Sequence, residues 1–289
     1  MLVVMEADAA AEAIEAVVSY LVAAGADVHR SSGQSRMILG VVGDVPSADA
    51  EVVAEMESVA KVLRVTEPYK LASRRFRRES SIVDGAWGAI GAERPWIAVE
   101  AAGYAEGESD EERESLPYAV AAGGPFDAAV TRSAHGPDNV GALSCLSIHA
   151  QPISSRFPVL FVTRDSSQSL DAWIETAEKE LIRGGDQVVL IEAGSAGGDG
   201  ARSLEVCNLA KTRAATHLPI IVDVPRIAGR RQYCAAVAYA AIAAGANGVI
   251  LRAWFGSPDK PPRVPATLPW DEATAVANRL RAIGEALRA

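Results

Sequence analysis

The stretch "HLPIIVDVPRIAGRR", residues 217–231, decides the fold of the larger part of this chain. Ile220, Ile221 and Val222 are typical of the interior of a buried strand, and Pro225 is expected to end it. Asp223 and Arg226 are then expected at the carboxyl end of that strand, where parallel α/β folds place their functional residues. The arginine is unexpected, because strand-end sites more often use histidine for metal binding or acid–base chemistry.

Similar apolar strands alternate with amphipathic helices through residues 91–289. This alternation predicts a parallel sheet covered on both faces, and the charged residues at the strand ends favour a (β/α) TIM-type barrel over an open sheet. The predicted strands cover residues 96–102, 126–131, 158–164, 187–194, 218–224 and 247–254, and the predicted helices cover 169–185, 204–217, 233–246 and 271–289.

Residues 1–66 have a different character and predict a small α+β domain of ferredoxin-like type, suited to regulation or interaction. Residues 67–90 follow as a linker, because "EPYKLASRRFRRESS" at 67–81 is polar and basic. Within the first domain the predicted strands are 2–5, 36–44 and 59–65, and the predicted helices are 9–25 and 48–56.

Composition excludes several classes of protein. Hydrophobic residues make up 49% of the 289 residues, enough for a substantial core. The formal net charge of −9 argues against non-specific binding of nucleic acid, and no apolar run has the length of a membrane span. The cysteines at 145, 207 and 234 are isolated, as in a cytoplasmic protein with reduced thiols.

The chain resembles one family, the 3-deoxy-D-arabino-heptulosonate 7-phosphate (DAHP) synthases of type I that have an N-terminal ferredoxin-like regulatory domain. The resemblance is closest in "VHRSSGQSRMILGVVGD", in "KVLRVTEPYKLASRRFRRESSIVDG" and in "HLPIIVD…GRR…AAIAAGANGVI". It implies a barrel that condenses phosphoenolpyruvate with erythrose 4-phosphate. In that family a divalent metal is held by Cys, His, Glu and Asp, while Lys and Arg clamp two phosphates.

This sequence departs from the family pattern at all four metal-binding positions. Tyr104 stands in the place of the cysteine, Arg226 in that of the histidine and Arg252 in that of the glutamate. Arg263 aligns, less securely, with the aspartate. A guanidinium is permanently cationic and cannot ligate a cation. The departures therefore predict a protein without a metal or other cofactor.

The phosphate clamp also departs from the pattern. Arg132 is kept at a strand end, whereas the catalytic lysine of the following loop becomes Pro137. Arg164 is expected to take a cationic role, and Glu192 is retained beside Ala193, which replaces an arginine. His135 and His149 lie in the remodelled middle, where either is a general acid or base or a structural histidine.

Taken together, these comparisons give two sets of candidate site residues. Tyr104 either donates a proton or fills the space of the metal, and the arginines either bind a carboxylate or phosphate or pair with nearby acids. The candidate catalytic residues are Tyr104, His135, Glu192 and Asp223, and the candidate anion-binding residues are Arg132, Arg164, Arg226, Arg252 and Arg263.

The barrel is also expected to lack one β/α unit. Only residues 133–140 separate "AAVTR" from "GALSCLSIHA", too few for the two helices and one strand that a full barrel needs there. About seven strands are therefore expected, by the minimum length of a crossover connection.

Three functions stay open. The first is a repurposed, metal-independent relative that either binds or also transforms a small anionic metabolite in or near aromatic or specialised biosynthesis. The second is a catalytically inactive regulatory or scaffold protein, and the third is an active DAHP synthase. A homo-oligomer, dimer or tetramer, is expected in each case, with no nucleic-acid or membrane partner.

Overall fold

The protein is described from a computed structural model. The structure describes residues 1–32, 36–43, 47–63, 68–85, 88–102, 125–132, 140–141, 143–147, 159–164, 166–197, 202–254 and 264–288. Among these residues, no helix combines the length and the apolar character that crossing a membrane requires.

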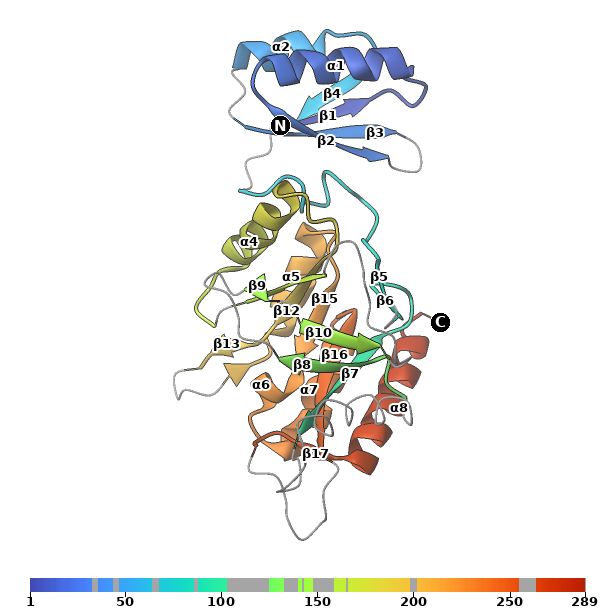
Figure 1. The fold of residues 1–289 in the computed structure, drawn as a ribbon, viewed down its shortest axis with the longest axis vertical. Helices are drawn as coiled ribbons and strands as arrows, with labels where there is room; N and C mark the ends of the chain where they lie inside the picture. The colour runs from blue at the N-terminus through green and yellow to red at the C-terminus, as the bar shows by residue number, and fades with distance from the viewer. Residues whose placement is uncertain are drawn as a thin grey trace.

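The N-terminal domain is a four-stranded antiparallel sheet with both of its helices on one face (Figure 1). The strand order β2-β3-β1-β4 confirms the predicted ferredoxin-like fold. Strand β2 was not predicted, because its sequence "DVHRSS" has no apolar alternation. The elements are β1 (Leu2–Met5), α1 (Ala11–Ala23), β2 (Asp27–Ser32), β3 (Met37–Val42), α2 (Ser47–Ala54) and β4 (Val59–Leu63).

Alternation along β1 gives this sheet two apolar faces. Val3 and Met5 pack in a buried cluster with Val17 and Leu21 of α1, whereas Leu2 packs on the opposite face. That opposite face needs a cover, and the segment after β4 supplies it.

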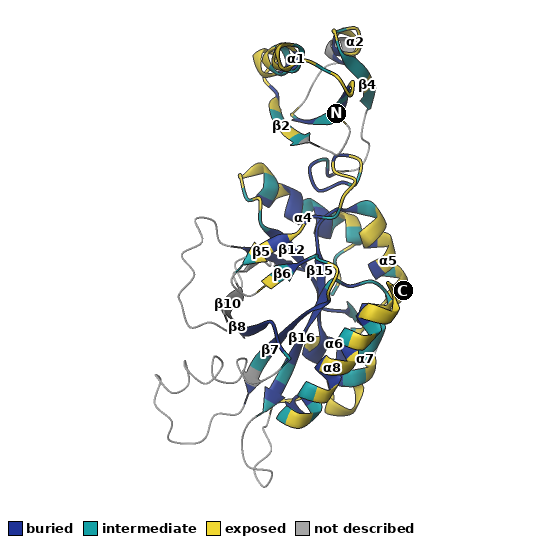
Figure 2. Cartoon of the chain, turned by 90° about the vertical axis from the view of Figure 1, so that its right-hand side faces the viewer, coloured by how far each residue is buried: buried dark blue, intermediate teal, exposed yellow. Residues whose placement is uncertain are grey.

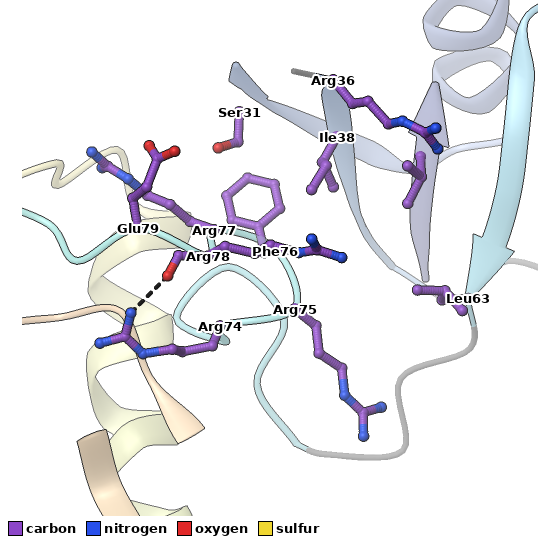
Figure 3. Close-up of a pocket in the computed structure, with 11 residues that line it drawn as sticks. Ser31, Arg36, Ile38, Leu63, Arg74, Arg75, Phe76, Arg77, Arg78 and Glu79 are labelled. Atoms are coloured by element: carbon purple, nitrogen blue, oxygen red, sulfur yellow. Dashed lines mark hydrogen bonds between the residues drawn. The ribbon is translucent and has the colours of Figure 1, made fainter. Parts of the chain in front are cut away.

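Phe76 is the centre of this cover and is buried against Leu2 and Leu71 (Figure 3). Gly40 of β3 lies beneath the ring, where a Cβ atom would come within 2.7 Å of Phe76 Cε2. A side chain at position 40 would therefore push the connecting segment away from the sheet. The region predicted as a linker is thus an ordered part of the domain interface over residues 68–85.

The second domain is a half-barrel of six parallel strands, in the order β8-β7-β16-β15-β12-β11. Short strands β10 and β9 add antiparallel edges, on β8 and β11 respectively. The bounds are β7 (Trp96–Ala102), β8 (Ala128–Arg132), β9 (Val140–Gly141), β10 (Leu143–Ser147), β11 (Leu160–Thr163), β12 (Val188–Glu192), β15 (Ile220–Asp223) and β16 (Gly248–Trp254).

Helices cover the outer face of this sheet (Figure 2), in agreement with the predicted α/β class. They are α4 (Leu170–Ile182), α5 (Val206–Ala215), α6 (Val224–Ala228), α7 (Arg231–Ala243) and α8 (Trp270–Ala286), with short strands β13 (Ser195–Ala196), β14 (Arg202–Ser203) and β17 (Leu268–Pro269). The loss of one β/α unit stays a prediction, because residues 103–124, 133–139 and 148–158 lie outside the described part of the chain.

The parallel strands are buried on both faces. Ile97, Val99 and Val162 face the helices, where Trp173 packs against them. Trp96, Phe161 and Ile191 are among those that face inward, together with Val83 and Ile90. The last two belong to a hairpin of β5 (Val83–Gly85) and β6 (Gly88–Ile90), which contributes its apolar side chains to the inner core.

The connecting segment is held to the half-barrel by buried polar groups. The Glu178 carboxylate on α4 accepts hydrogen bonds from the backbone N–H groups of Lys70, Leu71 and Ala72, at 2.7–2.9 Å. The Thr216 hydroxyl donates to the Ala72 carbonyl. These contacts lie at the amino ends of the strands, so the opposite, carboxyl ends point away from the N-terminal domain (Figure 1).

His217 completes this junction. Its Nε2 lies 2.7 Å from the Leu71 carbonyl oxygen, so Nε2 must be the protonated nitrogen, and its Nδ1 accepts from the Ser81 hydroxyl at 2.8 Å. Burial, opposed by the Leu71 hydrogen bond and aided by Arg77 and Arg74, lowers the pKa of His217 from 6.5 to about 4.

We expect the free energy of unfolding to fall as the pH is lowered from about 6.5 toward 4, because the unfolded chain then takes up a proton that the native chain excludes. The pKa difference of about 2.5 corresponds to about 3 kcal/mol at most. Urea unfolding at pH 7.5, 6 and 5 checks this. His217→Gln should lose this part of the pH dependence, whereas His29→Gln in β2 should keep it.

Candidate functional site

Charged side chains gather where the parallel strands end. Glu100 and Arg252 lie near the ends of β7 and β16, and Glu192 and Asp223 close β12 and β15. Arg164 follows directly after β11. Because the carboxyl ends of parallel strands meet at one edge, these five residues share the edge at which α/β folds bind ligands.

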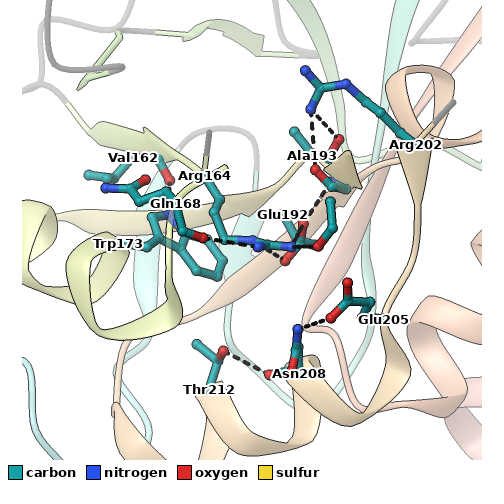
Figure 4. Close-up of polar contacts among 12 residues, drawn as sticks. Val162, Arg164, Gln168, Trp173, Glu192, Ala193, Arg202, Glu205, Asn208 and Thr212 are labelled. Atoms are coloured by element: carbon teal, nitrogen blue, oxygen red, sulfur yellow. Dashed lines mark hydrogen bonds and ion pairs between the residues drawn. The ribbon is translucent and has the colours of Figure 1, made fainter. Parts of the chain in front are cut away.

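Arg164 and Glu192 form a buried, two-pronged ion pair (Figure 4). Arg164 Nε and Nη2 each donate to one Glu192 oxygen at 2.8 Å, and the two side chains are 4% and 3% exposed. Arg164 also donates to the Ser195 hydroxyl and the Gln168 carbonyl, and its guanidinium carbon lies 5.9 Å from the ring centre of Trp173. Four donated hydrogen bonds leave Arg164 little capacity for a ligand.

Glu192 is occupied on its other side as well. Its Oε1 accepts from the backbone N–H of Gly194 at 2.6 Å. Arg202 of β14 donates to the carbonyls of Ala193 and Gly194, so the turn after β12 is held from both sides (Figure 4). Glu192 therefore orients Arg164 and this turn, which is a positioning role.

Arg252 is paired with Glu100, a residue that the sequence analysis missed. The two Cα atoms are partners in the register of β16 and β7, and Arg252 Nε and Nη2 donate to Glu100 Oε2 at 3.2 and 3.0 Å. Nη1 donates to the Pro265 carbonyl at 3.2 Å. Glu100 is the single charged residue of β7, and an isolated charge in an apolar strand was the signal that could have identified it.

Asp223 and Arg226 are linked through the backbone. The Asp223 carboxylate accepts from the Arg226 N–H at 3.3 Å and so caps α6, in which Pro225 occupies the first turn. The Arg226 side chain is exposed, and among the described residues it makes no ion pair. Among the strand-end arginines whose side chains are described, Arg226 therefore has a guanidinium available to a ligand from solvent.

A cavity of about 340 Å³ opens at this same end of the barrel. Arg230 and Arg231 line it from the start of α7, and Trp254 and Pro265 line it from the β16–β17 side. Arg231 forms an ion pair with Glu272 of α8, and the Pro265 carbonyl accepts a hydrogen bond from Arg252. The cavity thus adjoins the arginine-rich edge.

The remaining predicted residues are not placed. Tyr104, His135 and Arg263 lie outside the described residues, and Arg132 is described only as the backbone end of β8. Their predicted roles stay predictions. Of the nine predicted site residues, the structure brings together Arg164 with Glu192 and Asp223 with Arg226.

Comparison with known proteins assigns both domains. The sequence model of the DAHP synthase ferredoxin-like domain matches residues 1–67, and that of the DAHP synthetase I family matches residues 139–259. The chain belongs to the DAHP synthase type I family. It has the ferredoxin-like N-terminal domain that was expected.

Relatives of this DAHP synthase family member come from Thermotoga maritima. A phospho-2-dehydro-3-deoxyheptonate aldolase is 26% identical over 298 aligned positions, covering 87% of this chain and 88% of the relative. A crystal structure of the enzyme of that name from the same organism has a TM-score of 0.61 at 21% identity, covering 99% of this chain and 97% of that one. A truncated form of DAHP synthase has a TM-score of 0.60 at 20% identity, covering 76% and 98%.

The metal expected from the family does not fit the two described positions. Arg226 and Arg252 stand where the resemblance places the histidine and glutamate ligands, and the Arg252 guanidinium is already bound to a carboxylate. A guanidinium has no lone pair for a metal ion. These two residues of the DAHP synthase family member therefore cannot serve as metal ligands.

Proposed function

We propose that the barrel binds a small anionic metabolite at the carboxyl ends of its strands and that fixed arginines replace the family's metal in doing so. Arg226 is the group assigned to the ligand, because its exposed guanidinium makes no ion pair among the described residues. Guanidinium groups bind carboxylates and phosphates through two parallel hydrogen bonds, which suits such a ligand.

Arg252 supports the same ligand in this proposal. Glu100 holds its guanidinium in one orientation, and the Arg252 side chain keeps 15% exposure. An arginine held by a carboxylate loses less conformational entropy when it meets a second anion. Arg132 and Arg263 are further anion-binding candidates, and Arg164 is assigned to the buried ion pair instead.

A binding panel tests this proposal. We expect phosphoenolpyruvate or erythrose 4-phosphate to raise the melting temperature of the wild type in EDTA, because a ligand at about 100 times its dissociation constant adds about 2.7 kcal/mol. Arg226→Gln should lose most of that shift, whereas Arg279→Gln, an exposed arginine on α8, should keep it. Equal shifts in all three proteins would place the ligand elsewhere.

A second candidate is a catalytically inactive regulatory protein. The observation that favours it is that Arg164 and Arg252 are each neutralised by a carboxylate. A melting-temperature shift by an aromatic amino acid, unchanged in Arg226→Gln and without any shift by phosphorylated compounds, would favour this function. The homo-oligomer stays a prediction in both cases.

An active synthase is the third candidate, supported by the name of the Thermotoga maritima relative. Consumption of phosphoenolpyruvate in the presence of erythrose 4-phosphate and Mn²⁺, abolished by EDTA, would establish it. We expect no such consumption, because the two described metal positions hold arginine.

A further inference from the structure

A second cavity lies at the domain boundary, far from the carboxyl ends of the barrel strands. Its volume is about 720 Å³, and it lies between the face of the N-terminal sheet opposite the helices and residues 74–79 of the connecting segment (Figure 3). Strand β3 and the residue before it supply Ile38 and Arg36, and β1 and β4 supply Val4 and Leu63. The cavity therefore spans the domain boundary at the amino ends of the barrel strands.

The wall of this interdomain cavity is strongly basic. It contains five arginines and one glutamate, so it has four more positive than negative charges in a chain whose net charge is −9. The arginines are Arg36, Arg74, Arg75, Arg77 and Arg78, and the glutamate is Glu79.

Most of these charges are not balanced from within the described part of the chain. Arg36, Arg74, Arg77 and Arg78 form no ion pair with a described carboxylate. The bonds of Arg74 go to neutral groups, the carbonyls of Arg213 and Arg78 and the Ser80 hydroxyl. Arg77 likewise donates to the Ser81 hydroxyl. Gathered guanidinium groups repel one another until an anion enters.

Two basic side chains near the cavity have lowered pKa values. Burial, followed by the neighbouring charge of Arg213, lowers the pKa of Arg74. Arg77 and Arg74 also contribute to the lowered pKa of His217 behind the connecting segment. In both groups burial is the largest cause, and the neighbouring arginine charges act in the same direction.

The floor of the cavity is apolar. Phe76, Ile38, Leu63 and Val4 line it between the arginines, and Phe76 is held by its packing on Leu2 and Leu71. Arg36 and Arg78 approach from opposite sides of this floor (Figure 3). A ligand that fits both the apolar floor and the surrounding arginines has an apolar body and oxyanion groups at its edge.

We propose that this interdomain cavity is a binding site for a small organic anion that has a phosphate or carboxylate on an apolar ring. The ligand would contact the N-terminal sheet and the connecting segment, with its ring on Phe76 and its oxyanion between Arg36 and Arg78. It is distinct from the proposed metabolite at Arg226, which lies at the other end of the barrel strands.

Calorimetric titration of the full chain tests the site with three probes. Phenyl phosphate carries a phosphate on a benzene ring, and phthalate carries carboxylates on a benzene ring. Benzyl alcohol has the same ring and no charge. We expect the wild type to bind phenyl phosphate, phthalate or both, with an affinity that falls as NaCl is raised from 50 to 500 mM, and not to bind benzyl alcohol. The probe that binds more tightly shows whether the site prefers a phosphate or a carboxylate.

Matched variants locate the binding. R36Q/R78Q removes two cavity charges that make no described ion pair, and it should weaken binding at least tenfold. R183Q/R279Q removes two exposed charges elsewhere and should stay within twofold of the wild type. If R36Q/R78Q melts well below the wild type, Arg78→Gln alone should still weaken binding at least threefold.

The proposal is overturned if neither anion binds at millimolar concentration, if R36Q/R78Q binds as well as the wild type, or if R183Q/R279Q loses as much affinity. Loss of binding in Arg226→Gln alone would assign the probes to the barrel mouth and would also overturn it. Phosphoenolpyruvate binding is tested with Arg226→Gln, and binding of the aromatic probes is tested with R36Q/R78Q. Either proposed site can therefore be contradicted without the other.

Discussion

Replacement of Arg164 by methionine is expected to lower the free energy of unfolding by about 4 kcal/mol. The change leaves the Glu192 carboxylate buried without its partner, although methionine keeps the apolar contact with Trp173. Urea unfolding followed by tryptophan fluorescence measures the difference.

The double variant Arg164→Met/Glu192→Gln shows whether the loss of unfolding free energy comes from the unpaired Glu192 carboxylate. The neutral amide still accepts from Gly194, so we expect the double variant to lie within about 2 kcal/mol of the wild type. Arg183→Met breaks an ion pair with Glu180 whose arginine is 65% exposed, and it should cost under about 1 kcal/mol. A loss in Arg164→Met as small as that in Arg183→Met would contradict the assignment of Arg164 to the structure.

Glu178→Ala is expected to have a loss of similar size, about 4 kcal/mol, because three backbone N–H groups, of which those of Leu71 and Ala72 are buried, lose their acceptor together. The connecting segment should then detach from α4, and residues 68–81 should become accessible to protease. Unfolding by urea and limited proteolysis of the same samples measure both effects.

Glu175→Ala provides the control on the same helix. Its side chain is half-buried and has no described hydrogen-bond partner, so we expect a change of under about 0.5 kcal/mol and no new cleavage. Retained protection of residues 68–81 in Glu178→Ala would show that Phe76 and its neighbours hold the segment without the carboxylate.

The strands of the barrel could be predicted because their apolar runs are nearly continuous. Residues 220–223 and 188–192 are fully buried, as their sequences indicated. Helix α6 was missed, because Pro225 was interpreted as the end of a strand although it also fits the first turn of a helix. Asp223 before it was the capping signal.

The pairing of the site residues was harder to predict. The sequence analysis left two roles open for the arginines, ligand binding and pairing with acids, because pairing depends on which strands are neighbours. Arg252 lies 152 positions from Glu100, and only the adjacency of β16 and β7 brings them together. The buried acceptor role of Glu178 was missed for the same reason, since its partners lie more than 100 positions away.

Calorimetric titration of phosphoenolpyruvate measures whether the strand-end arginines bind an anion without a metal. We expect binding by the wild type in EDTA, no gain in affinity with Mn²⁺, and at least tenfold weaker binding by an Arg226→Gln/Arg252→Gln double variant. Binding that requires Mn²⁺, or that survives in the double variant unchanged, would contradict it.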